Sequence, residues 1–256
     1  MIIHINQAEI FFLVLVRITS FFVTAPFFGI RGVPVLARAG LGLLVTILIF
    51  PVMPQAQLSF DFNWTYILAL INETLAGLSL GYLTNLFFTV IQMAGQVLDI
   101  NMGLAMANLF DPQNGASTTI ISHCFSILGL LLFLQIDGHH TLLLELKESF
   151  SYLPLGGLNF DGGFTWTVVK LFSSSFALAI RIATPIIAVL LISDLSLSLI
   201  ARTVPQLNVF ILGFPVKVGL GLLSLIVSLP LLLTVFRSIF SQLEQDLALI
   251  LRSWPH

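Results

Sequence analysis

The fold of this chain is set by an apolar run at residues 66–91 that extends through Leu98; residues 66–98 read YILALINETLAGLSLGYLTNLFFTVIQMAGQVL. At 1.5 Å per residue a helix of this length extends roughly 50 Å. The hydrocarbon core of a bilayer is only about 30 Å thick. The stretch therefore predicts a helix that is too long for a simple membrane span.

Five further apolar runs flank this stretch, at residues 10–28, 39–52, 120–136, 168–192 and 209–236. Each predicts a helix, because membrane-spanning helices need about 20 apolar residues and these runs scatter around that length. We expect an all-α fold of hydrophobic, membrane-associated helical hairpins in one domain covering residues 1–256. The N-terminal run has no basic residue before it, and we expect it to be part of the mature chain rather than a signal peptide.

The composition excludes a soluble globular protein. Hydrophobic residues make up 57% of the chain and charged residues only 9%, whereas soluble domains carry about 25% charged residues. Most of the exterior must face lipid or other proteins. The net charge of -2 argues against a nucleic-acid ligand. The single cysteine, Cys124, excludes a disulfide within the chain and a metal site made of several thiolates.

The longest run carries a stripe of small and polar residues at helical spacing. Its members lie three or four residues apart, on one face of a helix: Gly77, Gly81, Asn85, Thr89, Gln92, Gln96 and Asp99. Small residues let helices approach closely, and amides bond between helices. The stripe indicates either a helix-packing seam or the polar wall of an aqueous path, and both require neighbouring helices.

Charged residues inside or at the edges of the apolar runs need partners. They are Arg17, Glu73, Arg181, Asp194 and Lys217. Each would cost roughly 3 kcal/mol facing lipid, so together they would cost on the order of 15 kcal/mol. They should face protein or water. Paired charges that fix packing and assembly are the more ordinary interpretation, and a proton or ion relay is the functional alternative.

The segment that follows Asp99 cannot be one continuous helix, because it contains Gly103, Pro112 and the turn pair Asn114-Gly115. It nevertheless carries large apolar side chains. Irregular backbone at membrane depth is tolerated only where protein surrounds it or where it lines a cavity. The segment indicates either an ordinary core loop or a re-entrant, plug-like loop at residues 103–117. The candidate plug or gasket residues are Met102, Gly103, Met106, Leu109, Phe110, Asp111 and Pro112.

Chemical motifs are scarce. Asp137, His139 and His140 follow the apolar run at residues 120–136, and His123 lies near the start of that run. Gly138 after an apolar run indicates a helix stop, with the imidazoles near a helix C-terminus. We expect no metal site, no cofactor and no catalytic residue, since no phosphate loop, nucleophile elbow or metalloprotease motif occurs. Residues 236–252 predict an amphipathic helix suited to a membrane interface or a partner.

Three blocks in series resemble the flagellar biosynthetic protein FliR family. They are AGQVLDINMGLAMANLFDP at 94–112, FLQIDGHH at 133–140 and ARTVPQLNVFILGFPVK at 201–217. The resemblance implies a structural and gating subunit of the type III protein export gate in the flagellar basal body, at the bacterial inner membrane. It implies FliP and FliQ as gate partners, FlhB and FlhA as neighbours, and unfolded proteins as substrates. It also implies that residues 103–117 close the pore, and that Pro185, Pro215 and Pro230 kink the later helices.

Three other assignments stay open. The virulence injectisome contains a counterpart of the same gate subunit. An ion-coupled secondary transporter of a small solute would use Glu73, Arg181 or Asp194 for coupling and would show internal repeats, which the sequence lacks. An intramembrane enzyme would need Asp137, His139 and His123 to converge on one site.

Overall fold

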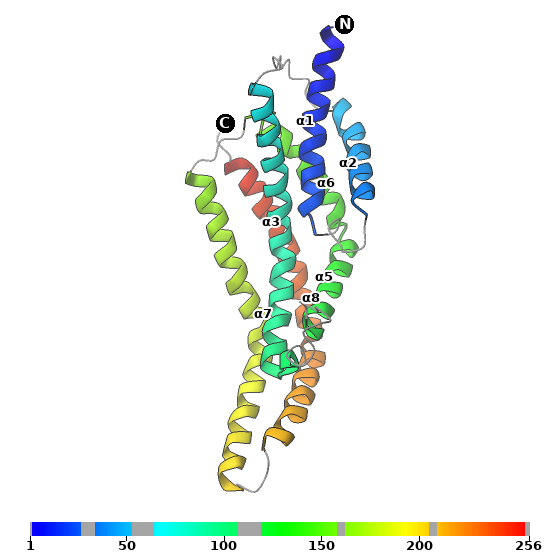
Figure 1. The fold of residues 1–256 in the computed structure, drawn as a ribbon. Helices are drawn as coiled ribbons and strands as arrows, with labels where there is room; N and C mark the ends of the chain where they lie inside the picture. Colours follow the sequence, from blue (N-terminus) through cyan, green and yellow to red (C-terminus); the bar gives the residue numbers. More distant parts are fainter. Residues whose placement is uncertain are drawn as a thin grey trace. The chain divides into compact units, whose positions relative to one another are not determined.

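The computed structural model describes residues 2–26, 34–52, 64–106, 119–157, 162–204 and 209–253. Its helices, shown in Figure 1, are α1 (Ile2–Thr24), α2 (Val35–Ile49), α3 (Trp64–Met102), α5 (Ile120–Gln135), α6 (Gly138–Tyr152), α7 (Gly162–Thr203) and α8 (Val209–Ser253). Short 3-10 turns occupy Phe50–Val52 and Leu104–Met106. These ranges contain no strand, which confirms the all-α fold.

Five helices of the described chain are long and apolar enough to cross a membrane, namely α1, α2, α3, α7 and α8. α5 and α6 meet the same test only as a pair, which is bent by 71°. Counting that pair as one span gives up to six, in line with the six apolar runs. α3 contains 39 residues, so it extends about 58 Å.

The chain divides into two compact units. Unit 1 consists of Met1–Phe87, Asp137–Leu171 and Ser241–His256, and unit 2 consists of Phe88–Ile136 and Phe172–Phe240. Since α3, α7 and α8 each run past one of these boundaries, each contributes residues to both units. Neither unit is a continuous piece of sequence.

Unit 1 is organised around the contact of α1 with the N-terminal part of α3. α1 buries Leu13, Ile18 and Phe22 completely. Its neighbour α2 packs alongside it, as Figure 1 shows in two shades of blue. α6 adds its own apolar side, with Leu142 and Leu146 buried. The apolar core of unit 1 thus includes residues of α1, α3 and α6, whereas the buried residues of α2 are Gly42 and Thr46.

Glycine makes the crossing of α1 and α3 possible. A Cβ at Gly77 would meet the backbone carbonyl of Arg17 and lie 2.8 Å from Ser20 Cβ. A Cβ at Gly81 would meet Thr24 and lie 2.7 Å from the Phe21 carbonyl oxygen. No larger residue fits at either place without shifting a helix, so these two members of the stripe form a packing seam.

Unit 2 is held by aromatic packing. Phe88 of α3, Phe133 of α5 and Phe240 of α8 pack with ring centroids 5.1 to 5.3 Å apart. Phe125 and Phe236 add an edge-to-face pair at 5.5 Å. Aromatic pairs in such geometry stabilise by about 0.5–1.5 kcal/mol beyond their buried area. These rings join three helices that are far apart in the sequence.

The C-terminal stretch at residues 236–252 is the last part of α8 and not a separate helix. Its pattern is amphipathic, but Phe236, Ile239, Phe240, Leu243 and Leu247 are buried within the chain itself. The expectation that this apolar side faces a membrane interface or a partner was wrong for these residues, because the chain's own helices cover them. Burial raises the pKa of the nearby Asp246 carboxyl above its ordinary value.

Much apolar surface stays uncovered elsewhere. Leu36 of α2 is 85% exposed, and Val227 of α8 is 74% exposed. Exposed apolar patches of this kind mark surfaces that contact lipid or other proteins. The structure therefore agrees with the inference from composition that much of the exterior does not face water.

The close contact of α1 with α3 predicts that alanine has opposite effects on stability at two glycines, Gly81 and Gly40. Gly81→Ala should lower the free energy of unfolding by about 1–3 kcal/mol, because the added methyl group overpacks the α1–α3 contact. Gly40→Ala is the matched control: a Cβ there meets nothing within 4 Å, and alanine should stabilise the α2 helix by about 0.5–1 kcal/mol. Thermal unfolding of the purified protein in detergent measures both. Equal midpoints for the two variants would contradict a close α1–α3 seam.

Candidate functional site

A fully buried ion pair lies in unit 1. Arg17 of α1 donates through Nε and Nη2 to the two carboxylate oxygens of Glu73 on α3. The exposed fractions of the two side chains are 0% and 1%. Two of the five predicted charges therefore pair with each other across two helices.

The same arginine also binds the end of α6. Its Nη1 and Nη2 donate to the Leu153 carbonyl at 3.1 Å each, and Nη1 donates to the Ser149 carbonyl at 3.3 Å. The last carbonyls of a helix have no partner within the helix, and a cation near them also matches the helix dipole. All five N–H donors of the guanidinium are thereby used. The Phe150 ring covers the guanidinium at 4.4 Å.

The turn after α6 completes this cluster. Gly156 has φ +76°, a conformation that favours glycine. Its amide donates to Glu73 Oε1 at 2.8 Å, and its carbonyl accepts from Asn72 Nδ2 at 2.9 Å. We call Arg17, Asn72, Glu73 and Gly156, with the carbonyls of Ser149 and Leu153, the Arg17 cluster. It joins α1, α3 and α6.

A second buried charge, Asp99, lies at the other end of α3, in unit 2. One carboxylate oxygen accepts from the Ile121 amide at 3.1 Å, and the other accepts from the Ser122 amide at 2.9 Å and from the Thr119 hydroxyl. These amides belong to the first turn of α5, where backbone donors lack helical partners. Thr119 occupies the N-cap position but its own side chain makes no capping bond. Asp99 caps α5 from another helix.

The backbone contact beside Asp99 is equally close. A Cβ at Gly95 would lie 2.5 Å from Ser122 Cα, and the Ser122 hydroxyl donates to the Gln92 carbonyl at 3.1 Å. We call Gln92, Gly95, Asp99, Thr119 and Ser122 the Asp99 cluster. Because Asp99 precedes the segment 103–118 and Thr119 follows it, the two ends of that segment are held at one place.

The start of this segment is fixed by α8. Met102 is fully buried, and a Cβ at Gly221 would lie 2.5 Å from its Cε. Gly103 has φ +83° and its Cα faces the Phe214 ring, which a Cβ would approach to 3.3 Å. Met102 is therefore a packing anchor in the described chain, and Gly103 provides the turn that ends α3.

Most of the predicted plug falls outside the described residues. Leu109, Phe110, Asp111 and Pro112 lie in the segment 107–118, which the structure does not describe. The backbone of Met106 ends the short turn Leu104–Met106. The proposed sealing role of these residues stays a prediction.

The predicted polar stripe is divided by the structure. Gly77 and Gly81 form the α1 seam, and Asp99 caps α5, as described above. The residues between them, Asn85, Thr89, Gln92 and Gln96, are half-buried. The seam interpretation thus accounts for both ends of the stripe.

The remaining predicted charges lie in unit 2. Lys217 Nζ of α8 contacts Asp194 Oδ1 of α7 at 2.6 Å, with side chains 28% and 43% exposed. Arg181 of α7 is exposed. The structure thus pairs four of the five charges and leaves Arg181 on the surface.

The histidine group lies at a helix start rather than a helix end. α5 ends at Gln135, Asp137 has φ 57°, and α6 begins at Gly138. The expectation that His139 and His140 lie near a helix C-terminus was wrong, because a new helix begins directly after the break.

The ligand atoms of Asp137, His139 and His140 lie within 4.8 Å of one another. The positive end of the α6 dipole opposes a cation there. The absence of a metal site remains a prediction.

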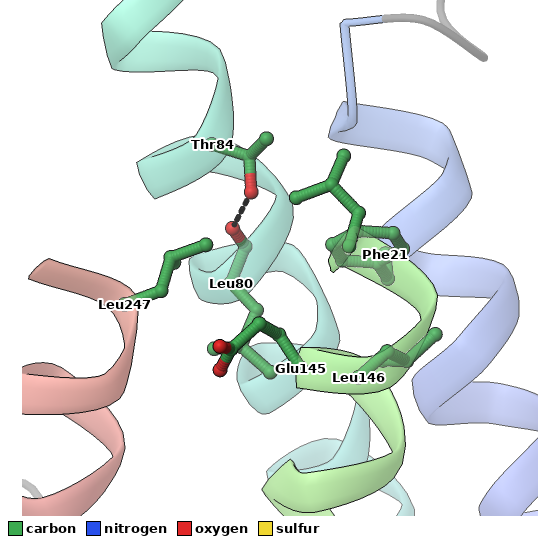
Figure 2. Close-up of a pocket in the computed structure, with 7 residues that line it drawn as sticks. Phe21, Leu80, Thr84, Glu145, Leu146 and Leu247 are labelled. Carbon is green, nitrogen blue, oxygen red and sulfur yellow. Dashed lines mark hydrogen bonds between the residues drawn. The ribbon is translucent and has the colours of Figure 1, made fainter. Parts of the chain in front are cut away.

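A small cavity of about 10 Å³ lies in unit 1 among Phe21, Leu80, Thr84, Leu142, Glu145, Leu146 and Leu247. Figure 2 shows the Glu145 carboxylate near Leu80, and the Thr84 hydroxyl donates to the Leu80 carbonyl at 3.0 Å. The space is about that of one water molecule, so it is too small for a ligand.

Sequence comparison identifies the family. Residues 8–243 match the model described as bacterial export proteins, family 1. The chain belongs to this family. It is 36% identical over 234 residues to the flagellar biosynthetic protein FliR of Bacillus subtilis (strain 168), covering 90% of each chain. It is 33% identical over 247 residues to FliR of Pectobacterium carotovorum subsp. carotovorum, covering 96% of this chain and 94% of the relative.

FliR of Escherichia coli (strain K12) is similar over 251 residues at 29% identity. The match covers 98% of this chain and 96% of the relative. These matches confirm the resemblance to the FliR family that three sequence blocks indicated.

Sequence reasoning missed several partners of the two clusters. Thr119 directly precedes an apolar run, which is the usual signature of an N-cap, and it could have located the start of α5. Nothing local marks Ser149, Leu153 or Gly156, since they contribute backbone atoms only to the Arg17 cluster.

The Arg17 cluster predicts non-additive substitutions. Arg17→Leu and Glu73→Leu should each lower the free energy of unfolding by about 3–5 kcal/mol, because each leaves the other charge buried and unpaired. The double variant should cost less than the two changes together, by about 1–3 kcal/mol. Denaturant or thermal unfolding of the four proteins in detergent provides the cycle. Strict additivity would show that the two side chains do not act as a pair.

The Asp99 cluster predicts a local effect. Asp99→Ala should destabilise the first turn of α5 by about 1–2 kcal/mol, because its amides lose their cap. Hydrogen exchange measures this as faster exchange at Ile121 and Ser122. Amides of α6 serve as the internal control, since α6 makes no contact in the Asp99 cluster. Unchanged protection at Ile121 and Ser122 would refute the capping role.

Proposed function

We propose that this chain is a structural and gating subunit of the type III protein export gate, in the flagellar apparatus of the bacterial inner membrane. The whole-length match to FliR proteins carries the proposal. The exposed apolar helices support it, because a gate subunit covers such surfaces with lipid and neighbouring subunits. The relatives named above are flagellar, which favours the flagellum over the injectisome.

FliP and FliQ are the proposed gate partners, with FlhB and FlhA as neighbouring export components and unfolded proteins as substrates. In such an assembly the chain performs no covalent chemistry, and we propose no catalytic residue or cofactor. Its contribution is to shape a passage and to close it. The two buried clusters support this role, because they fix helix ends rather than present reactive groups to a ligand.

The segment 103–117 is the proposed closure. Asp99 binds Thr119 and the first amides of α5, and Met102 packs on Gly221. The chain therefore leaves and returns at nearly one point, as expected of a compact loop with a fixed base rather than of a linker. A loop of this kind can move as a unit while the helices that carry it stay in place.

The apolar side chains of the segment supply the proposed seal. Met106, Leu109 and Phe110 are large and apolar, and methionine adapts to irregular gaps. A narrow apolar constriction expels water and so blocks ions. An unfolded substrate displaces the loop, and the fixed base returns it when the substrate has passed.

The experiment uses the full chain expressed with the other gate subunits in a motile bacterium that lacks its own FliR. Deleting most of residues 103–117 should make the membrane permeable to potassium, because the apolar seal is lost. The complex should still assemble, because Asp99 and Met102 remain. Potassium efflux and the size of the purified complex measure the two effects.

A same-length replacement of residues 103–117 by glycine and serine separates chemistry from length. It should also leak, because the loop is present but no longer apolar. An intact ion barrier in both variants, with the complex assembled, would refute the sealing role of the segment.

A further inference from the structure

Arg181 is a charge on the exposed side of an apolar helix in unit 2. The buried side of α7 at this level is formed by residues three and four apart, namely Ala179, Ile182, Ala183, Ile186 and Leu190. Arg181 lies on the opposite side of the helix, and its side chain is exposed. Within the described residues it forms no ion pair and no hydrogen bond.

Arg181 differs from the other four charges of the apolar runs, which are paired with one another. Arg17 pairs with Glu73, and Lys217 pairs with Asp194. In both cases an opposite charge on a different helix compensates the charge within the chain. Arg181 has no such partner among the described residues, so its compensation must come from elsewhere.

Lipid is a poor neighbour for this side chain. Along α7, Arg181 lies about 22 Å from Trp166 and about 33 Å from Thr203, the two ends of the apolar window, at 1.5 Å per residue. The window is longer than the about 30 Å of hydrocarbon, and Arg181 lies in its interior among exposed apolar side chains, including Phe176, Ile180 and Val189. An arginine that faces hydrocarbon is strongly disfavoured.

The surface around Arg181 suits another helix. Ala177, Thr184 and Ala188 lie on the same side, one or two turns away, and all three are exposed. Small side chains let a second helix approach closely. The Thr184 hydroxyl donates to the Ile180 carbonyl at 2.8 Å, so this neighbour does not compete for an incoming acceptor. A guanidinium can bind a carboxylate through two parallel hydrogen bonds, and this bidentate contact has a specific geometry.

We propose that the face of α7 centred on Arg181 docks an apolar helix of a neighbouring subunit, and that an aspartate or glutamate of that helix binds the guanidinium. The inference rests on the proposed function only in requiring that the chain is one subunit of a larger complex. It does not depend on the closure by residues 103–117.

The test compares Arg181→Lys, Arg181→Leu and Arg181→Glu in the full chain, expressed with the other gate subunits. Arg181→Glu and Arg181→Leu should lower the yield of full-size complex about tenfold or more, since removing one partner of a buried charge pair is costly. Arg181→Lys should give a yield between those of Arg181→Leu and the wild type, because it keeps the charge but loses the bidentate geometry of the guanidinium. Arg202→Glu, at an exposed arginine in the last turn of the same helix, is the matched control and should leave the yield unchanged.

A folding readout keeps the result interpretable. Protease resistance of each variant chain, purified alone in detergent, should equal that of the wild type, because Arg181 has no partner among the described residues. The decisive step is charge reversal in the partner. In the Arg181→Glu background, changing one carboxylate in a partner's apolar helices to lysine should restore the complex.

Three results would overturn the docking. Full assembly of Arg181→Leu would show that no carboxylate of a partner binds at this face, which then meets water or lipid. Rescue of Arg181→Glu only by a reversal at Asp61, Asp111 or Asp161 of this chain would show an internal pair. A protease-sensitive Arg181→Glu chain would show an internal role. If the wild-type chain forms no complex when it is expressed with the other gate subunits, the proposed function fails first, and that outcome is distinct from the other three.

Discussion

Helix ends inside an apolar chain impose the main physical constraint on this fold. The first amides and the last carbonyls of a helix have no partner within it, and here there is little polar surface to satisfy them. The chain meets this demand with buried charges from other helices. Arg17 binds the carbonyls at the end of α6, and Asp99 binds the amides at the start of α5. In each case the sign of the charge matches the helix dipole.

This constraint links the packing to the candidate site. Asp99 holds α5 against α3 and at the same time fixes the base of the segment 103–118. Gly95 supports it, because only a glycine allows the backbone of α5 to approach so closely. The base of the proposed closure therefore depends on ordinary helix capping by Asp99.

The sequence predicted the elements well because apolar runs and helix lengths are local properties. Spacing alone placed Gly77 and Gly81 on one face of α3, and the structure brings α1 close to α3 at both positions. Pairing was harder: Arg17 and Glu73 are 56 residues apart, and a single sequence shows only that each needs a partner.

Other features escaped prediction for different physical reasons. The helix restart at Gly138 was missed because a glycine after an apolar run usually ends a helix. The burial of Phe236 and Phe240 was missed because an amphipathic pattern does not say what covers its apolar side. Tertiary contacts decide both cases, and neither leaves a local trace in the sequence.

The interleaving of the two units has a consequence for biosynthesis. The chain passes between them at residues 87–88, 136–137, 171–172 and 240–241, and three of these passages lie inside continuous helices. Unit 2 lacks its final helix until Phe240 has been made, and unit 1 lacks Leu243 and Leu247 until even later. A growing chain on the ribosome thus cannot complete either core early. A truncated chain would expose apolar surface from both cores. Both cores therefore form only when translation is nearly finished.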